Sequence, residues 1–444
     1  MRIGKSFWWV LALLASSIIA ATIPTLQGNT IYIRLIFTWS LIIVIGWVWA
    51  FLSVQGIDVY RHSRTLRHNV GQLFVERFDV INRSRLTKVW LKISDDCDLP
   101  GSDGSRILSN IGGKQSRSYS SQTLLRYRGM FTLGPTTISS GDIFGLFTFT
   151  RQLPSQTRLI VLPYMVSLSH FPAPFGVLPG GRALRRKTTE VTPFSAGVRE
   201  YMPGDPLRRI HWPTTARKQQ LIVKEFEQDP LAEIWIFLDA REDVQSVLDE
   251  SAITPKDPGS FFWMSLRPKF ELPPSTVEYS ISAAASIAKY YIDQKREVGL
   301  SVYGQTHTML PAERGERQMG KILETLALLK TEGAMPLHVL VGSQINSLVR
   351  GSTVVLITAS VDQEVVFTAG EILLRGMLPV VVLLDAASFG GNKGSDELEA
   401  ELIQGGFIVT RIKFGEDLAP ALERKQMRLP DRQISWNKAM ISKG

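Results

Sequence analysis

The chain has 444 residues, enough for two or three domains, with 44% hydrophobic residues and a formal net charge of +9. That charge is modest for the length and excludes a strongly basic nucleic-acid-binding protein, so we expect no nucleic-acid partner. Cys97 is the single cysteine, which excludes an intramolecular disulfide and a cysteine-based zinc site and fits a reducing compartment.

Two apolar segments open the chain, at about residues 7–26 and 33–54, and each is long enough to cross about 30 Å of hydrocarbon as a helix. Arg2 and Lys5 precede the first segment, and a basic run at 61–67 follows the second. The positive-inside rule therefore predicts a multi-pass cell-membrane protein with a transmembrane hairpin at 1–56 and a cytoplasmic C-terminal region. We expect the basic run to contact lipid headgroups.

A cleaved signal peptide is the alternative for the first segment. Arg2 and Lys5 form a basic start, and Ala20 and Ala21 offer small residues for cleavage. The second segment would then be the sole anchor, and the large C-terminal region would face outward.

A β-rich domain is predicted for residues 57–168. Apolar and polar residues alternate with period two at 87–93, and glycines punctuate the run 126–153 as tight turns. This pattern predicts a small antiparallel sandwich or barrel. No nucleophile–base pair or ligand cluster stands out in it.

Residues 169–230 read as a turn-rich linker. The stretch 202–205 predicts a type II turn, and Asp205, followed by proline, predicts the N-cap of a short helix. Trp212 precedes a proline, which disfavours helix at that residue. Basic and acidic residues balance here, which favours an ion-pair network over a phosphate-binding patch.

An α/β domain is predicted for residues 231–444, because buried strands alternate with helical patterns. The strands are expected at 232–238, 298–303, 353–358, 380–384 and 407–412. This order predicts a doubly wound, mostly parallel sheet covered on both faces. Ser275 and Glu278 predict a capping box. The aromatic stretch 261–264 predicts either a docking surface or a small satellite core.

Asp239 follows the first of these strands, at the edge where α/β sheets bind ligands. Asp243, Ser360 and Asp362 could join it around a Mg²⁺ ion. A von Willebrand factor type A domain places Asp-x-Ser-x-Ser at this edge, but Arg241 stands where the first hydroxyl is needed. We therefore expect no cofactor, and an ion pair between Asp239 and Arg241 instead.

Catalysis is a separate hypothesis. Asp205 and His211 are residue types that a hydrolase uses, but none of the familiar nucleophile, phosphate-loop or zinc-protease motifs occurs in its context. We expect a non-enzymatic protein, with a hydrolase using these two residues as the alternative.

The stretch 198–217, VREYMPGDPLRRIHWPTTAR, resembles the signature of the domain of unknown function 58 family. The residues that carry the likeness, or that we expect to act in interaction, are Arg199, Glu200, Tyr201, Gly204, Asp205, Arg208, Arg209, Trp212 and Arg217. The apolar hairpin and the run RGMFTLGPTTISSGDIFGLF are similar to that family too. Members commonly carry an acid where His211 stands.

The resemblance implies a membrane-anchored protein with a von Willebrand factor A-like C-terminal domain. It also implies that the protein is encoded beside MoxR-type AAA+ ATPases and transglutaminase-like proteins. We therefore predict a scaffold or adaptor that contacts membrane lipid and a MoxR-type ATPase in envelope or complex maturation.

Overall fold

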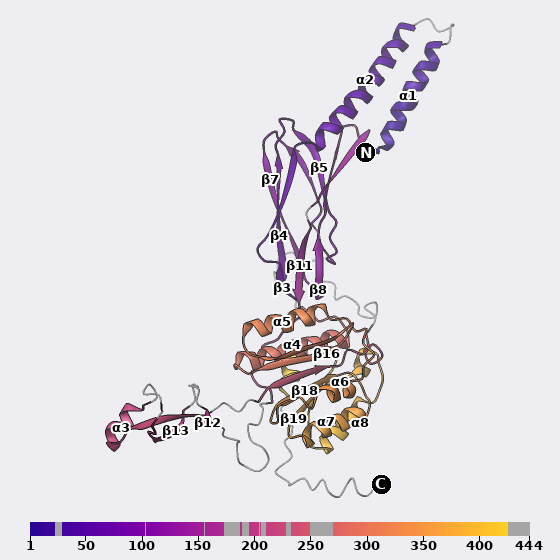
Figure 1. Cartoon of the computed structure of the whole chain (residues 1–444). Coiled ribbons are helices and arrows are strands. Elements are labelled where there is room, and N and C mark those ends of the chain that lie inside the picture. The colour runs from indigo at the N-terminus through magenta and orange to yellow at the C-terminus, as the bar shows by residue number, and fades with distance from the viewer. Residues whose placement is uncertain are drawn as a thin grey trace. The chain divides into compact units, whose positions relative to one another are not determined.

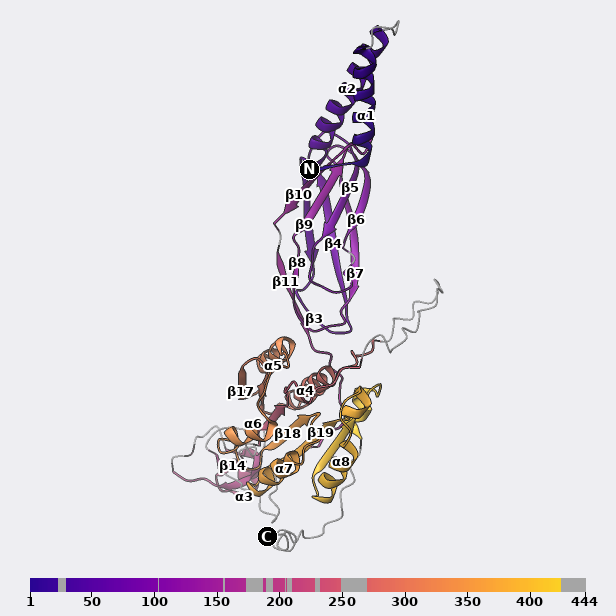
Figure 2. The same ribbon diagram turned by 90° about the vertical axis from the view of Figure 1, so that its right-hand side faces the viewer.

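The computed structural model describes residues 1–22, 29–102, 104–154, 156–172, 187–188, 195–203, 205, 210–227, 232–248 and 270–424. Its contacts divide the chain into two compact units, Met1–Leu162 and Pro163–Gly444. Each unit is shown in Figures 1 and 2 and is described by itself. The predicted aromatic stretch 261–264 lies outside the described residues.

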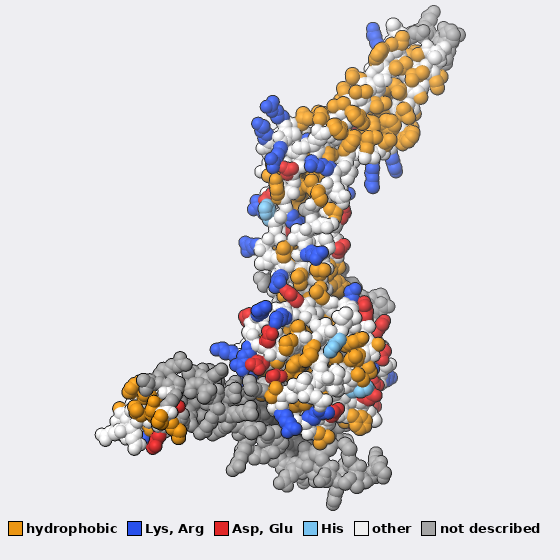
Figure 3. All heavy atoms as spheres, in the orientation of Figure 1, with side chains coloured by type: hydrophobic (Ala, Val, Ile, Leu, Met, Phe, Trp, Pro, Cys, Tyr) orange, Lys and Arg blue, Asp and Glu red, His pale blue; other side chains and the backbone are white. Residues whose placement is uncertain are grey.

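The first unit begins with a hairpin of two apolar helices, α1 (Lys5–Thr22) and α2 (Asn29–Val54). Both are long and apolar enough to cross a membrane, judged by length and composition. Large apolar side chains, among them Trp9 and Phe37, are exposed on them, and Figure 3 shows this hydrophobic surface. An exposed apolar surface of this extent marks an interaction site for lipid or protein.

Among the described residues of this unit, one short strand precedes the two helices and ten strands follow them. They are β1 (Arg2–Ile3), β2 (Ile57–Ser63), β3 (Arg67–Asn69), β4 (Leu73–Asn82), β5 (Lys88–Asp95), β6 (Arg106–Ile111), β7 (Ser116–Leu124), β8 (Gly129–Leu133), β9 (Thr136–Gly141), β10 (Phe147–Leu153) and β11 (Thr157–Leu162). The sheets run β1-β10-β9-β5-β6, β2-β4-β7 and β3-β11-β8. All pairs are antiparallel except β3–β11.

The β-rich core lies between the sheets β1-β10-β9-β5-β6 and β2-β4-β7. Phe78, Leu91, Ile93, Ile111 and Ile138 are fully buried in it. They occupy alternate positions, since side chains on a strand point to opposite faces in turn. The period-two alternation in the sequence therefore marks the buried face correctly at Leu91 and Ile93. It is wrong at the start of the run, where Val89 is exposed and Lys88 is buried.

The helical hairpin is built into this β structure at both ends. β1 pairs with β10 just before α1 begins, and α2 continues almost directly into β2. Lys88 is buried in β5, and its Nζ donates to the carbonyls of Leu52 (2.7 Å) and Gln55 (3.0 Å) at the end of α2. A cation at a helix C-terminus satisfies carbonyls that the helix cannot pair itself.

Arg61 departs from the expectation that the basic run contacts lipid. Its side chain is buried in the β core, where Nε lies 3.2 Å from Glu76 Oε1 and the guanidinium also pairs with Asp95. The ring of Phe78 lies beneath it, 4.9 Å from the guanidinium carbon to the centroid. The expectation is therefore wrong for Arg61, because period-two alternation in β2 turns this residue inward.

The second unit contains a mixed six-stranded sheet in the order β17-β16-β15-β18-β19-β20. Its strands are β15 (Ile234–Leu238), β16 (Val298–Tyr303), β17 (His307–Glu313), β18 (Thr353–Thr358), β19 (Leu378–Leu384) and β20 (Ile408–Ile412). All neighbours are parallel except the edge pair β16–β17. The sequence reading missed β17, whose alternate residues are exposed.

Helices pack on both faces of this sheet. They are α4 (Thr276–Asp293), α5 (Glu316–Leu328), α6 (Leu337–Gln344), α7 (Glu364–Leu374), α8 (Ser395–Gln404) and α9 (Leu418–Glu423). α4 contacts α5 and α9, whereas α7 contacts α6 and α8. Strands buried on both faces need apolar side chains at nearly every position, which explains the continuous run IWIFL in β15.

A smaller sheet, β12-β14-β13, comes from the predicted linker. It consists of β12 (Lys187–Thr188), β13 (Ser195–Glu200) and β14 (Ile222–Glu227), with α3 (Trp212–Lys218) between the last two. The linker prediction is therefore corrected for β13, because residues 195–200 pair antiparallel with β14.

Candidate functional site

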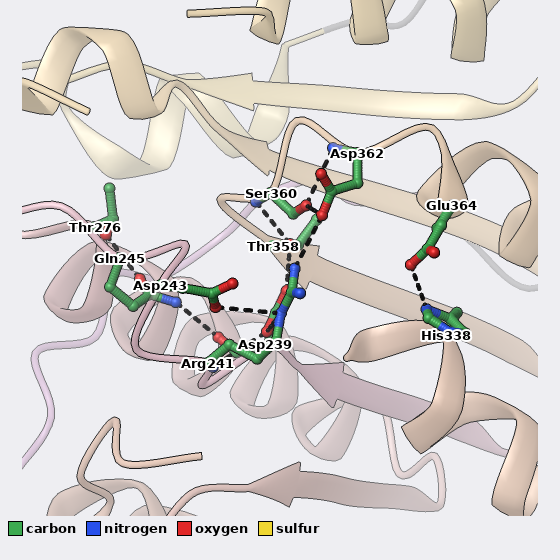
Figure 4. Close-up of polar contacts among 10 residues, drawn as sticks. All are labelled: Asp239, Arg241, Asp243, Gln245, Thr276, His338, Thr358, Ser360, Asp362 and Glu364. Carbon is green, nitrogen blue, oxygen red and sulfur yellow. Dashed lines mark hydrogen bonds and ion pairs between the residues drawn. The ribbon is translucent and has the colours of Figure 1, made fainter. Parts of the chain in front are cut away.

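The first candidate site is the carboxyl edge of the six-stranded sheet, shown in Figure 4. Asp239 follows β15 directly and is almost completely buried. Thr358, the last residue of the neighbouring strand β18, donates its hydroxyl to Asp239 Oδ2 at 2.8 Å. The backbone N–H of Arg241 donates to the other carboxylate oxygen at 3.2 Å. Adjacent parallel strands therefore bring this carboxylate and its donors together.

Arg241 lies at the centre of this edge. Its Nε lies 3.6 Å from Asp239 Oδ1 and 3.7 Å from Asp243 Oδ1, and its Nη2 donates to Asp362 Oδ2 at 3.1 Å. One guanidinium therefore joins three carboxylates from two loops. The ion pair predicted between Asp239 and Arg241 is present, and it extends to both of the other predicted carboxylates.

The loop after β18 supplies the third carboxylate. Ser360 donates its hydroxyl to Asp362 Oδ2 at 2.7 Å, and the N–H of Ser360 donates to Thr358 Oγ1 at 2.9 Å. The N–H of Asp362 in turn donates to Ser360 Oγ at 3.1 Å. These short-range bonds hold Asp362 over Arg241.

The two ends of this network differ in electrostatic setting. Burial raises the pKa of Asp239, although Thr358 and Arg241 act in the opposite direction. The hydrogen bond from Ser360 lowers the pKa of Asp362, and Arg241 adds to the effect. Burial opposes the charge of Arg241, but the surrounding carboxylates outweigh it and its pKa is raised. Arg241 therefore stays cationic.

The network does not fit a divalent cation. Asp239, Asp243 and Asp362 point toward Arg241, so a fixed cation occupies the place where Mg²⁺ would need free carboxylate oxygens. Within the described ranges, no group of three or more His, Cys, Asp or Glu side chains is arranged to hold a metal ion.

Two further residues connect this edge to α4. The Gln245 side-chain amide donates to the carbonyl of Asp239 at 3.0 Å, and the Thr276 hydroxyl donates to Gln245 Oε1 at 2.7 Å. The predicted capping box is wrong, because Ser275 occupies the N-cap position of α4 but its hydroxyl makes no capping bond. The adjacent Thr276 hydroxyl instead bonds to the loop that carries Gln245.

The sequence reading missed Thr358, Gln245 and Thr276 as members of this network. A polar residue ending an otherwise apolar strand, as Thr358 does in TVVLIT, was the available signal. It also missed the nearby pair His338–Glu364, in which Nδ1 lies 2.6 Å from Oε2 (Figure 4). Nothing in the spacing of those two residues indicates that they meet.

The second candidate site is the signature segment. The N–H of Asp205 donates to the carbonyl of Met202 at 3.0 Å, so the chain turns between these residues, and the N–H of Met202 donates to Asp205 Oδ2 at 2.9 Å. Gly204, Arg208 and Arg209 lie outside the described residues, as do the continuation of the helix predicted after Asp205 and the side chain of Arg199.

Trp212 begins α3, so the prediction that helix is disfavoured there is wrong. Pro213 falls in the first helical turn, where its missing N–H needs no intrahelical acceptor. The Trp212 side chain is 65% exposed. His211 is the N-cap residue, and its Nδ1 lies 2.6 Å from Thr214 Oγ1. His211 therefore has a local structural contact within α3.

The remaining signature residues flank this helix. Glu200 ends β13 and is exposed, and the N–H of Tyr201 donates to the carbonyl of Leu221 at 2.8 Å. Arg217 lies in the last turn of α3 and is exposed. A cation in the last turn interacts favourably with the helix C-terminus. The segment thus presents an aromatic ring and charges on a folded hairpin.

Residues 197–247 match the family model described as Protein of unknown function DUF58. This match and the relative described next support the DUF58 family. The matched residues include both the signature segment and the loop that carries Asp239, Arg241 and Asp243. The uncharacterized protein YeaD of Bacillus subtilis (strain 168) is 22% identical over 263 residues, which cover 58% of this chain. The match spans 57% of the length of YeaD.

Two solved structures are weakly similar to this chain. A FixG-related protein from Vibrio parahaemolyticus is 11% identical and covers 24% of this chain and 98% of its own, with a TM-score of 0.17. The alkylpurine DNA glycosylase AlkC of Pseudomonas fluorescens, bound to DNA, is 11% identical and covers 35% and 42%, also with a TM-score of 0.17. Scores this low carry no argument about fold or function.

Proposed function

We propose that this DUF58 protein is a membrane-anchored adaptor that binds its protein partner without a metal ion. The observation that carries the proposal is the position of Arg241, which neutralises a buried carboxylate while two outer carboxylates stay accessible. Asp243 is 71% exposed and Asp362 is 52% exposed. Such an edge can accept basic side chains of a partner.

A von Willebrand factor A-like character of the C-terminal sheet is part of this proposal. It is supported by the strand order, by the antiparallel edge strand β17 and by the convergence of loop residues at the carboxyl ends of β15 and β18. In that comparison Arg241 takes the place of the Mg²⁺ ion, and the exposed carboxylates of Asp243 and Asp362 remain around it. The expected partner surface is then basic.

A MoxR-type AAA+ ATPase is the partner that the family resemblance implies, in envelope or complex maturation. We infer that the exposed Trp212 of the signature segment contributes a second contact, because exposed tryptophans are enriched among residues that dominate binding. We infer that a transglutaminase-like protein is a further member of such an assembly.

The membrane anchor is proposed from the two apolar helices, with the large C-terminal region cytoplasmic. The pairing of Arg2 and Ile3 with β10 supports an uncleaved first helix, because removal of a signal peptide would remove an edge strand of the β structure. A reporter fused after Gly444 should give a cytoplasmic signal. An external signal would contradict the orientation.

Binding of the purified ATPase tests the adaptor proposal. The full-length protein, immobilised in detergent, is titrated with the MoxR-type ATPase encoded in the same genome. We expect Asp243→Asn/Asp362→Asn and Trp212→Ala each to weaken binding at least about tenfold, the equivalent of about 1.4 kcal/mol.

The matched control is Glu332→Gln/Glu371→Gln, which removes two exposed carboxylates elsewhere on the same unit. Equal binding by the Asp243/Asp362 variant and the wild type would contradict the proposed edge. No binding by the wild-type chain would contradict the ATPase as partner. His211→Ala should leave binding unchanged.

A further inference from the structure

The loop between β9 and β10 carries two large apolar side chains that have no place in the core. Ile143 is 64% exposed and Phe144 is 62% exposed. Isolated exposed residues need no explanation, but these two are adjacent, and their loop contacts both apolar helices.

A buried carboxylate holds this loop in shape. Asp142 is almost completely buried, and its two oxygens accept the N–H groups of Phe144 (2.9 Å) and Phe147 (2.7 Å). The backbone on both sides of Ile143 is thereby fixed. The exposed pair is presented on a rigid support.

The loop lies against the base of α1 and the side of α2. The N–H of Gly4 donates to the carbonyl of Leu146 at 2.8 Å, and a Cβ at Gly4 would lie 1.9 Å from the carbonyl oxygen of Gly145. A Cβ at Gly46 of α2 would lie 3.2 Å from Leu146 Cδ1 and 3.7 Å from Asp142 Oδ2. The loop therefore marks the level at which both helices leave the β structure.

The C-terminal part of α2, residues 47–54, packs against β strands. Ala50 is fully buried with Phe147, and Phe51 packs edge-on against Phe149 with ring centroids 5.7 Å apart. Trp47 also contacts Phe149, at 6.5 Å. This part of the helix is covered by protein on one side.

The part of α2 that precedes residue 47 is about as long as α1. Residues 30–46 of α2 rise about 25 Å at 1.5 Å per residue, and the 18 residues of α1 rise about 27 Å. The 25-residue apolar span of α2 would rise about 38 Å, more than the about 30 Å of a hydrocarbon core. A boundary near Gly46 therefore gives two helices of equal length that nearly fill the bilayer.

Side chains suited to a membrane interface gather at the same level. Trp8 and Trp9, at the start of α1, are exposed, and so is Trp47. Arg2 and Lys5 are exposed beside them. Indoles favour the headgroup level, and cations pair with anionic lipid phosphates.

We infer that the loop 142–146 is a membrane-interface anchor: Ile143 and Phe144 insert among the lipid chains of the cytoplasmic leaflet, and the bilayer boundary lies at the level of Gly46. The occupant of this apolar surface is phospholipid, because the surface continues into the two apolar helices and is flanked by cations. This inference rests on the proposed membrane anchor. It also ends the predicted span 33–54 about two turns early, leaving residues 47–54 as a stalk that fixes the β structure at the membrane.

Fluorescence quenching by lipid tests this inference on the full chain. Cys97→Ser provides a cysteine-free background, and Ile143→Cys and Phe144→Cys each carry an environment-sensitive fluorophore. The proteins are reconstituted in vesicles of phosphatidylglycerol and phosphatidylethanolamine. The lipids carry a nitroxide either close to the headgroup or near the end of the acyl chain.

Two matched positions serve as controls. Leu41→Cys labels an exposed position in α2 on the membrane side of Gly46, and Leu73→Cys labels an exposed position at the start of β4. β4 runs from Leu73 to Asn82, which pairs with Ile57 next to α2. Leu73 therefore lies roughly 30 Å along the strand from the helix end, at about 3.4 Å per residue.

We expect strong quenching at residues 143 and 144 by the shallow nitroxide, stronger quenching at residue 41 by the deep one, and none at residue 73. Absence of quenching at 143 and 144, with residue 41 quenched, would overturn this inference and leave the membrane anchor intact. Absence of quenching at residue 41 would overturn the anchor itself. Deep quenching at 143 and 144 would overturn the boundary at Gly46.

Discussion

The arginine–carboxylate clusters around Arg61 in the first unit and Arg241 in the second show how burial separates a structural role from a functional one. Arg61 in the β core is 9% exposed, and its partners Glu76 and Asp95 have side chains that are 1% exposed. Arg241 at the sheet edge is 12% exposed, but Asp243 and Asp362 face solvent. The first cluster is closed to any partner, whereas the second offers carboxylates to one.

The closed cluster also has the less favourable contacts. The side-chain nitrogens of Arg61 lie within ion-pair distance of the carboxylate oxygens of Glu76 and Asp95. None of these atoms makes a contact with hydrogen-bond geometry. At the edge, hydrogen bonds from Thr358 and Ser360 satisfy the carboxylates of Asp239 and Asp362. Charges enclosed without such bonds depend on one another, so loss of one partner is costly.

Removal of Arg61 has the largest expected effect. Arg61→Met leaves two enclosed carboxylates without a counter-ion, and we expect the β structure to lose about 3–5 kcal/mol of stability. Hydrogen–deuterium exchange of the full chain in detergent, read on peptides of β4 and β7, measures this loss. Peptides of β18 and β19 should be unchanged.

The control for this variant is Arg77→Met, which removes an exposed arginine that pairs with Asp79 on the same strand. Exposed pairs contribute less than about 1 kcal/mol. Similar exchange in the two variants would mean that the enclosed cluster is no more important than a surface ion pair.

The pH dependence of the closed cluster is the second prediction. Burial raises the pKa of Glu76 from 4.5 to about 7, against the opposing effect of Arg61. The folded state therefore binds this proton more tightly than the unfolded state. The resulting stabilisation is fully present below pH 4.5 and is lost as the pH rises through about 7.

The shift corresponds to at most about 3.5 kcal/mol, since one pKa unit is about 1.4 kcal/mol. Thermal unfolding of the wild-type chain should show a falling midpoint for the β structure over this pH range. Glu76→Gln stays neutral and should flatten the profile. A profile that is the same in both proteins would mean that another group titrates.

Arg241→Ala should have a smaller effect, about 1–3 kcal/mol, measured as exchange in β15 and β18. Asp239 keeps its bonds from Thr358 and from the backbone of residue 241, and the two outer carboxylates are solvated. Arg241→Lys retains the charge and should recover part of the loss. A loss as large as that of Arg61→Met would make this edge a closed structural cluster as well.

Metal binding by a variant of Arg241 is a further test of the difference between the two clusters. Arg241→Ser places a hydroxyl among Asp239, Asp243 and Asp362, and we expect it to bind Mn²⁺ or Mg²⁺ in calorimetric titration, whereas the wild-type chain does not. Asp239→Asn added to this variant should abolish binding. Cation binding by the wild type would contradict the role given to Arg241.

The sequence predicts the helices and strands of this protein better than the contacts between them. The apolar strands of the C-terminal sheet and the period-two face of the β core are visible because burial imposes a repeating pattern. The Asp239–Arg241 pair is also predictable, since the two residues are close in the chain. The family signature at 198–217 is visible from residue types alone.

Contacts between distant residues are not predictable from one sequence. Nothing in the sequence pairs Arg61 with Glu76, because the same basic run serves equally well as a topology signal. Thr358 meets Asp239 only because β15 and β18 are neighbours, which depends on the strand order. The missed edge strand β17 alternates too weakly in hydrophobicity to stand out.

The smallest effect on stability belongs to Asp362→Asn, and it tests the functional half of the comparison. Asp362 is half exposed, so its pair with Arg241 is screened by water, and we expect the stability to change by less than about 1 kcal/mol. The asparagine keeps the shape but removes the charge that a basic partner needs. Exchange in β18 should therefore be unchanged while ATPase binding weakens. If binding is unchanged as well, the outer carboxylates only orient Arg241, and the open cluster is structural like the closed one.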